Sequence, residues 1–122
     1  MVRTVKIGNN EYDLKSSAYT MFAYKDVTGN NLLQDLNELN DKYTKWQKDK
    51  DTSIWMNEIM DIIDKTLRLA HIMILEQNPS FMEYKQWLKE IDGLLDDTNW
   101  ILEVLEVGLS PFRRGVQSAP KQ

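Results

Sequence analysis

The chain contains no cysteine and only one histidine among its 122 residues. Disulfide bonds, thiolate nucleophiles and cysteine-based zinc sites are therefore excluded. The sequence also lacks a glycine-rich phosphate loop, a GxSxG nucleophile motif and the charged and apolar segments of a secretory leader. We therefore expect a cytoplasmic protein, and we predict no cofactor.

Positive charge is scarce in the middle of the chain, and the net charge is −4. Residues 51–110 carry four basic and twelve acidic side chains, whereas residues 111–122 carry three basic and none acidic. An acidic body argues against nucleic-acid binding, which needs a cationic face. No uncharged apolar run approaches the roughly 20 residues that a membrane-spanning helix needs. We expect neither nucleic acid nor membrane as a partner.

The longest strongly apolar stretch covers residues 54–77 and contains neither glycine nor proline. Its apolar side chains recur at steps of three and four residues, at Ile59, Ile63, Leu67, Ala70 and Ile74. This spacing predicts a helix, capped near residues 51–53. Because its second half is apolar almost all round, we expect the other elements to pack around it.

The first residues alternate apolar and polar side chains on both sides of Gly8-Asn9-Asn10. This pattern predicts a β-hairpin with strands at about 3–7 and 11–14. A two-stranded hairpin is marginally stable by itself in water, so it must lie on the helices or pair with another chain.

Helix signals follow the hairpin. Ser16 or Ser17 is a candidate N-cap for a helix over 18–27, with Gly29 just past its end. The next helix opens at Asn-Leu-Leu and has a leucine-rich edge, formed by Leu32, Leu33, Leu36 and Leu39 and followed by Tyr43 and Trp46. We predict that the polar stretch 37–53 is a frayed helix end followed by a loop.

Two further helices are predicted after the central one. Ser80 and Glu83 have capping-box spacing at the start of the first. The second begins after Asp96-Asp97-Thr98 and is closed by Gly108 and Pro111. The predicted fold is thus α+β and mainly α, with an N-terminal hairpin and about five helices packed around residues 54–77. Residues 1–110 form one domain, and residues 111–122 form a flexible basic tail.

The single histidine, His71, lies in the most apolar segment of the central helix. It is either a general base or metal ligand, or a core imidazole with one hydrogen bond. The core interpretation is favoured because neither a cysteine nor a second histidine exists to complete a site. We predict no metal site.

Pairs of carboxylates spaced three residues apart on helices offer a second candidate chemistry. Asp35 with Glu38, and Glu58 with Asp61, resemble the acidic motifs of all-α nucleotide pyrophosphatases of the MazG type. Such pairs on facing helices can hold Mg²⁺ against a nucleotide. That family has glutamate at the first position, where this chain has Asp35. Solvated helix faces are the alternative interpretation.

Four tryptophans are many for this length. Trp46 lies in the polar stretch, so it is the best candidate for an exposed aromatic at a partner interface. Packing over its own helix is the alternative for Trp46.

The hairpin VKIGNNEYDLK, the aromatic helix AYTMFAYKDVTG and the following Asn-Leu-Leu resemble the tail assembly chaperones of long-tailed phages and prophages of Gram-positive bacteria. The resemblance covers residues 3–109 and is strongest over residues 5–33. The polar stretch 40–53 departs from the family pattern.

This resemblance implies binding and no catalysis. Such chaperones keep the tape measure protein soluble, help to recruit tail tube subunits and are absent from the mature virion. We therefore expect three kinds of partner: the tape measure protein, the tail tube protein and further copies of the chain in a homo-oligomer. Phe112, Arg113 and Arg114 of the basic tail are candidate partner-binding residues. A small helical interaction or regulatory protein without a phage role is a further alternative.

Overall fold

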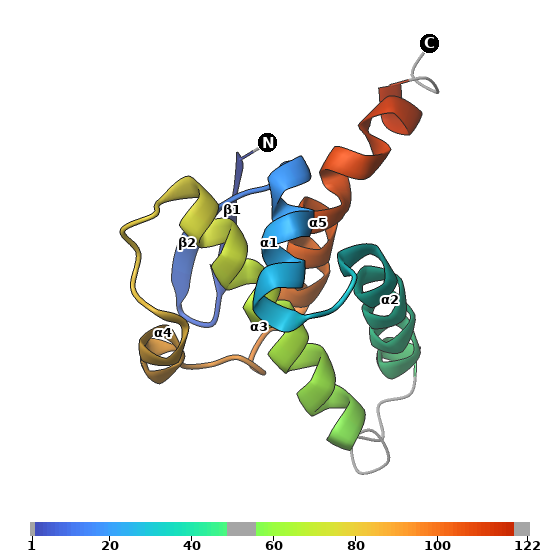
Figure 1. The fold of residues 1–122 in the computed structure, drawn as a ribbon. Helices are drawn as coiled ribbons and strands as arrows, with labels where there is room; N and C mark the ends of the chain where they lie inside the picture. Colours follow the sequence, from blue (N-terminus) through green and yellow to red (C-terminus); the bar gives the residue numbers. More distant parts are fainter. Residues whose placement is uncertain (1, 49–55, 119–122) are drawn as a thin grey trace.

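The computed structural model describes residues 2–48 and 56–118, although it describes only the backbone of residues 56, 57 and 113–118. The predicted architecture of an N-terminal hairpin followed by five helices is confirmed (Figure 1). The elements are β1 (Val2–Ile7), β2 (Asn10–Lys15), α1 (Ala18–Thr28), α2 (Leu32–Lys48), α3 (Met56–Gln77), α4 (Tyr84–Glu90) and α5 (Asn99–Ser118).

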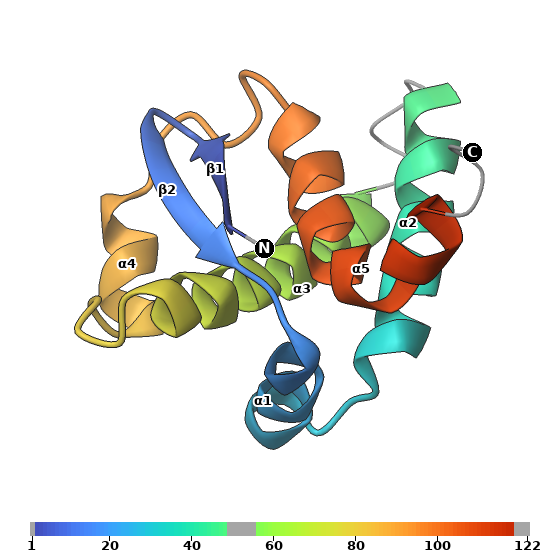
Figure 2. The same cartoon turned by 90° about the horizontal axis from the view of Figure 1, so that it is seen from above.

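The central helix α3 contacts β2, α1, α2 and α5. Figure 2 shows it running beneath the hairpin, with α1, α2 and α5 along its length. Its buried side chains include Ile62, Leu69, Ala70 and Met73, which are at most 1% exposed. The prediction that residues 54–77 form the helix around which the fold is built is confirmed for residues 56–77. Residues 51–55, with the predicted caps, lie outside the described residues.

The hairpin is antiparallel, with Val5 opposite Tyr12 and Ile7 opposite Asn10. Gly8 takes a φ of 64° at the turn, a conformation that glycine adopts without steric cost. A Cβ on Gly8 would lie 2.2 Å from the carbonyl oxygen of Asp92, so the turn is seated directly on the connection between α4 and α5. The hairpin therefore lies on the helices, as its marginal stability requires.

Helix α1 begins at the predicted residue and ends at Thr28, one residue after the predicted end. The Ser17 hydroxyl accepts a hydrogen bond from the backbone N–H of Tyr19, and Gly29 has a φ of 80° after the last turn. The Thr20 hydroxyl donates to Oε1 of Glu76 at 2.7 Å, and the Ser17 hydroxyl donates to Oε2 of the same carboxylate. The start of α1 is thereby tied to the end of α3.

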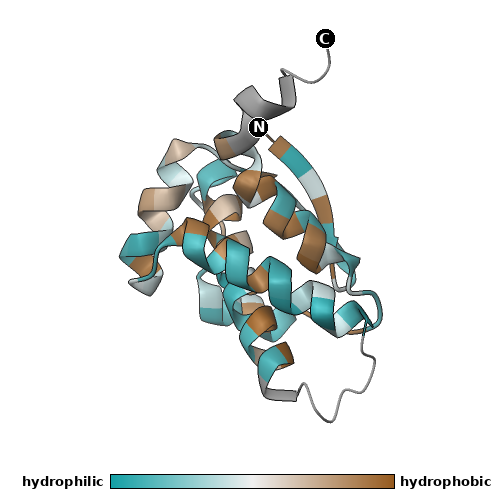
Figure 3. Ribbon diagram, turned by 90° about the vertical axis from the view of Figure 1, so that its right-hand side faces the viewer, coloured by the Kyte–Doolittle hydropathy of each residue, from teal (hydrophilic) through white to brown (hydrophobic). Residues whose placement is uncertain are grey.

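The prediction of a frayed helix end after residue 37 is wrong, because α2 continues to Lys48. Residues 49–53, the rest of the stretch in which the loop was predicted, lie outside the described residues. Leu39, Tyr43 and Trp46 follow one another at helical spacing and are at most 8% exposed, so the apolar stripe continues under the polar residues. Figure 3 looks onto the side of the molecule where α2 lies. The ribbon there is mostly hydrophilic, with hydrophobic residues at intervals.

The prediction of a capping box from Ser80 to Glu83 is also wrong. Helix α4 starts at Tyr84, with Glu83 as an N-cap whose side chain makes no capping hydrogen bond. Residues 78–81 instead form a turn, in which the backbone N–H of Phe81 donates to the carbonyl of Asn78 at 3.0 Å. Gly93, with a φ of 73°, lies in the predicted break after this helix.

The prediction that Gly108 and Pro111 close the last helix is wrong, because α5 continues to Ser118. Proline has no N–H for the carbonyl of Val107, four residues earlier. The hydroxyl of Ser110 donates to that carbonyl at 2.8 Å and replaces the missing bond. Helix α5 changes direction toward its C-terminal end (Figure 2), as expected at a proline. The backbone of residues 111–118 therefore belongs to α5, and residues 119–122 lie outside the described residues.

Candidate functional site

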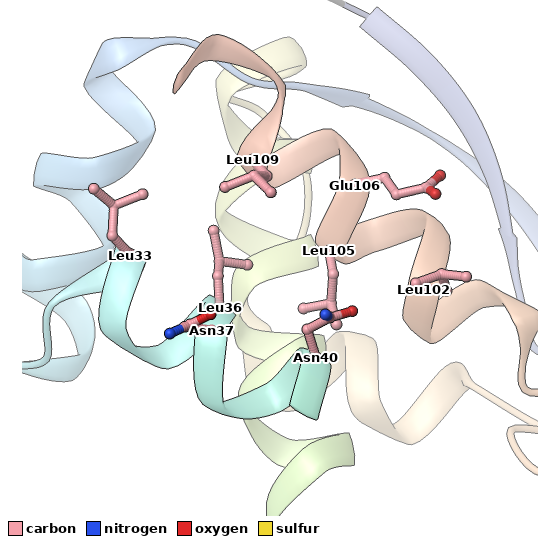
Figure 4. Close-up of a pocket in the computed structure, with 8 residues that line it drawn as sticks. All are labelled: Leu33, Leu36, Asn37, Asn40, Leu102, Leu105, Glu106 and Leu109. Carbon is pink, nitrogen blue, oxygen red and sulfur yellow. The ribbon is translucent and has the colours of Figure 1, made fainter. Parts of the chain in front are cut away.

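An apolar groove lies between α2 and α5 (Figure 4). It has a volume of about 270 Å³ and is lined mainly by leucines from the two helices. Its lining residues are Leu33, Leu36, Asn37, Asn40, Leu102, Leu105, Glu106 and Leu109. Leu33 and Leu102 are 41% and 40% exposed, so the groove presents apolar side chains to solvent from both of its walls.

Next to the groove, a glycine of α5 lies in close contact with α3. A Cβ on Gly108 would lie 2.9 Å from a methyl carbon of Leu69 and 3.7 Å from one of Leu36. Gly108 therefore lets α5 lie close to Leu69 of α3, whereas the 3.7 Å to Leu36 is an ordinary van der Waals distance.

The position of α2 is fixed by a buried polar pair. The hydroxyl of Tyr24, on α1, donates to Oδ2 of Asp35, on α2, at 2.6 Å. Tyr24 is 1% and Asp35 6% exposed. Burial and the adjacent Asp35 carboxylate raise the pKa of Tyr24 well above its ordinary value, so the phenol remains a donor. Asp35 immediately precedes Leu36, so this bond sets the rotation of α2 at the groove.

The polar rim of the groove is connected to the hairpin. Glu106 lies on the rim and pairs with the Arg3 guanidinium of β1 at 3.2 Å, while Glu103 lies 3.8 Å from the same guanidinium. On the opposite wall, Asn37 and Asn40 present amides. A partner thus meets an apolar strip bordered by hydrogen-bonding groups, with one carboxylate on one side.

Among the predicted partner residues whose side chains the structure describes, Phe112 is close in sequence to a groove residue. It is three residues after Leu109 on α5, is partly buried and packs against the core. The backbones of Arg113 and Arg114 belong to α5, but their side chains are not described. The expectation that Trp46 is exposed is wrong, because it is 8% exposed and packs edge-to-face on Tyr43 at 5.9 Å.

Sequence reasoning missed the two exposed leucines as site residues. Leu33 was assigned to the apolar edge of its helix, yet one residue corresponds to a rotation of about 100° from the buried Leu32. Leu102 similarly lies off the stripe of Ile101 and Leu105. The usable signal was therefore a large apolar residue outside the buried stripe.

Three of the four carboxylates in the pyrophosphatase hypothesis are paired with other side chains of the protein. Lys42 Nζ lies 3.0 Å from Oε2 of Glu58 and 3.2 Å from Oδ2 of Asp61. The hydrogen bond with Glu58 is the main cause that raises the pKa of Lys42. Asp35 is occupied by Tyr24, and Glu38 is exposed on α2. Within the described ranges, no group of three metal-binding side chains lies together. This geometry gives the hypothesis no support.

His71 is a core imidazole, as the favoured interpretation predicted. It is 8% exposed, its Nε2 lies 2.8 Å from the carbonyl oxygen of Met82, and its ring stacks on Trp87 with centroids 5.6 Å apart. Phe81 and Tyr84 contact the same ring. The imidazole therefore joins α3 to α4.

Across residues 2–48 and 56–118, no helix has both the length and the apolar character needed to cross a membrane. No protein-family model, curated protein or solved structure is significantly similar to the chain.

Proposed function

We propose that this chain is a tail assembly chaperone that binds an amphipathic helix of a tape measure protein in the groove between α2 and α5. The observation that carries the proposal is the leucine-lined groove, with Leu33 and Leu102 about two-fifths exposed on its opposite walls. The order of hairpin, aromatic helix and Asn-Leu-Leu supports the same family. Help in recruiting tail tube subunits belongs to the same proposal.

The shape of the groove favours a helix as its occupant. Two neighbouring helices form a channel into which a third can lay apolar residues spaced i, i+3, i+4 and i+7. At about 270 Å³ the groove lies just below the roughly 300–1,000 Å³ of typical small-molecule sites. It therefore suits a few side chains of a larger partner better than a whole small ligand.

The chemistry of the rim favours an amphipathic helix over a uniformly apolar one. Asn37 and Asn40 offer amide donors and acceptors beside the leucines, and Glu106 offers a carboxylate. A long helical protein with exposed apolar stripes would aggregate without such a cover. Covering these stripes is what a soluble chaperone for it must do.

The proposal is tested by co-expressing the chain with the tape measure protein encoded in the same genome. The soluble fraction of the tape measure protein is measured by sedimentation, and complex formation is measured by co-elution. Leu33→Glu and Leu102→Glu should each weaken the complex by about tenfold or more. Burial of one leucine contributes about 1.5–3 kcal/mol, and each variant also places a charge in the apolar contact.

Leu95→Glu is the matched control, because Leu95 is 60% exposed and lies outside the groove. It should leave the complex unchanged. All three variants should keep the circular dichroism of the parent, since each changes an exposed side chain. If the groove variants solubilise the tape measure protein as well as the parent does, or if Leu95→Glu is equally damaging, the proposal is wrong.

A further inference from the structure

The outer edge of β2 is a second surface of interest, on the side of the hairpin away from β1. The sheet has only two strands, in the order β1-β2. The edge residues of β2 lie above the C-terminal end of α3 and beside the segment that leads to α4 (Figure 2). An unpaired strand edge presents a row of backbone N–H and C=O groups to any chain that can pair with it.

The register shows which backbone groups point outward. The two-residue turn is closed by Ile7 and Asn10, and Val5 pairs with Tyr12. In an antiparallel hairpin, every second pair exchanges hydrogen bonds, so Asn10 and Tyr12 face β1. The N–H and C=O of Glu11 and Asp13 therefore face the outer edge. Within the part of the chain that the structure describes, no backbone group outside the hairpin bonds to them.

A cavity of about 260 Å³ lies beside these residues. It is lined by Glu11, Tyr12, Asp13, Ile74, Gln77, Asn78 and Phe81. Ile74 is buried, and Phe81 packs edge-to-face on Tyr12 with ring centroids 6.0 Å apart. The edge of the strand thus adjoins a space with apolar walls and two amides.

Two carboxylates lie on the outer strand, with Lys6 opposite Glu11 on β1, Lys15 at the end of β2, and the Thr4 hydroxyl donating to Asp13 at 2.6 Å. Glu11 and Asp13 are both exposed, and neither makes an ion pair within 4.0 Å among the described residues. Even Lys6, directly opposite Glu11, makes no such pair. The last turn of α3 contains no basic residue, so the negative end of its dipole is not neutralised by its own side chains.

We propose that the β2 edge binds an extended segment of a partner protein in which basic and apolar residues alternate. The segment would pair with the outward backbone groups of Glu11 and Asp13. Its residues opposite these two carboxylates would be lysine or arginine, on the same face of the sheet. Its residue opposite Tyr12 would be apolar and would enter the cavity, because side chains alternate between the faces of a strand.

A second copy of β2 is a poor occupant. Antiparallel pairing of two β2 strands about Tyr12 would place Glu11 of one copy opposite Asp13 of the other. Like charges directly opposite each other on a sheet are destabilising. The proposed segment has the complementary charge. This surface is independent of the groove between α2 and α5, so either proposal can fail without the other.

The test uses a fluorescent peptide of about six residues, a typical strand length, that alternates lysine and valine. Binding to the whole chain is followed by fluorescence anisotropy and by backbone amide NMR. The peptide should bind, shift the amides of Glu11 and Asp13 and slow their hydrogen exchange. A peptide with glutamate in place of lysine should bind at least tenfold more weakly.

Two controls separate strand pairing from simple charge attraction. N-methylation of the peptide nitrogens that face β2 should abolish binding, whereas N-methylation of the alternate nitrogens should leave it. Glu11→Gln should weaken binding several-fold, while Glu38→Gln on the exposed face of α2 should not. The proposal is overturned if both methylated peptides bind equally, or if the shifted amides lie in α2 and α5. Concentration-dependent dimerisation through β2 without peptide would also overturn it.

Discussion

The hydrogen bond between Tyr24 and Asp35 offers the most direct test of how the groove is positioned. Tyr24→Phe removes only the hydroxyl and leaves the buried Asp35 carboxylate without its 2.6 Å partner. Hydrogen bonds to charged groups contribute about 1.5–3 kcal/mol, and an orphaned buried partner brings the cost toward the upper figure. We therefore expect Tyr24→Phe to lower the free energy of unfolding by about 2–3 kcal/mol.

The assay is urea unfolding followed by circular dichroism, with Asp35→Asn and the double variant completing a cycle. Asparagine keeps an acceptor for the phenol but loses the charge near the start of α2, so it should cost about 1 kcal/mol. Tyr24→Phe and Asp35→Asn should be less than additive, with a coupling energy of about 1 kcal/mol or more, because each removes part of one interaction. The slope against urea should not change.

Tyr19→Phe is the control on the same helix, since Tyr19 is 64% exposed. It should change the free energy of unfolding by less than about 0.5 kcal/mol. If Tyr24→Phe is equally silent, or if the cycle shows no coupling, then the pair does not hold α1 to α2. The account of how Leu36 and its neighbours are positioned would then have to be abandoned.

Three further predictions concern the turns, α5 and alkaline pH. Ser110→Ala should cost about 1–3 kcal/mol in urea unfolding because it orphans a buried carbonyl, but almost nothing in a Pro111→Ala background, where a backbone N–H returns. Gly8→Ala should cost about 2–4 kcal/mol through positive φ and overlap; Gly29→Ala, also at positive φ but with open space around its Cβ position, should cost only about 1 kcal/mol. Burial and neighbouring negative charge raise the pKa of Tyr84 to about 12, so stability should fall as pH rises from about 10 through that value, because the unfolded state loses the phenolic proton first. Tyr84→Phe should make this fall shallower in urea titrations at alkaline pH, and an unchanged slope would contradict the assignment.

Periodicity predicted the larger elements because burial follows it closely. The stripe from Ile59 to Ile74 and the alternation around Gly8 are both set by short-range geometry, which the sequence carries directly. The start and end of α1 were equally readable, because Ser17 and Gly29 act on neighbouring backbone groups. The fold class followed from these signals.

The wrongly predicted ends of α2 and α5 have two different physical causes. In α2 the charged side chains occupy the solvent face, so they do not interrupt the stripe that includes Tyr43 and Trp46. In α5 the effect of Pro111 depends on whether another donor reaches the freed carbonyl, and Ser110 supplies it. The first outcome depends on which face of the helix is buried, and the second depends on a hydrogen bond from a neighbouring side chain.

The candidate groove was not predictable, because it exists only where two distant segments meet. Leu33 and Leu102 can be recognised in the sequence as large apolar residues outside the buried stripes, but this does not show that α2 and α5 meet beside them. The pairing of Glu58 and Asp61 with Lys42 is likewise a tertiary fact. Spacing along one helix shows that carboxylates are neighbours, but not which group from another helix neutralises them.

The contact between the hairpin turn and the connection after α4 has a consequence for folding during synthesis. Gly8 rests against Asp92, which is synthesised 84 residues later (92 minus 8). The turn therefore reaches this contact only after those 84 residues have been added to the nascent chain. Throughout that interval both strand edges of the nascent hairpin are unpaired and could pair with other nascent chains. Its charged side chains, Lys6 and Glu11 among them, oppose such pairing.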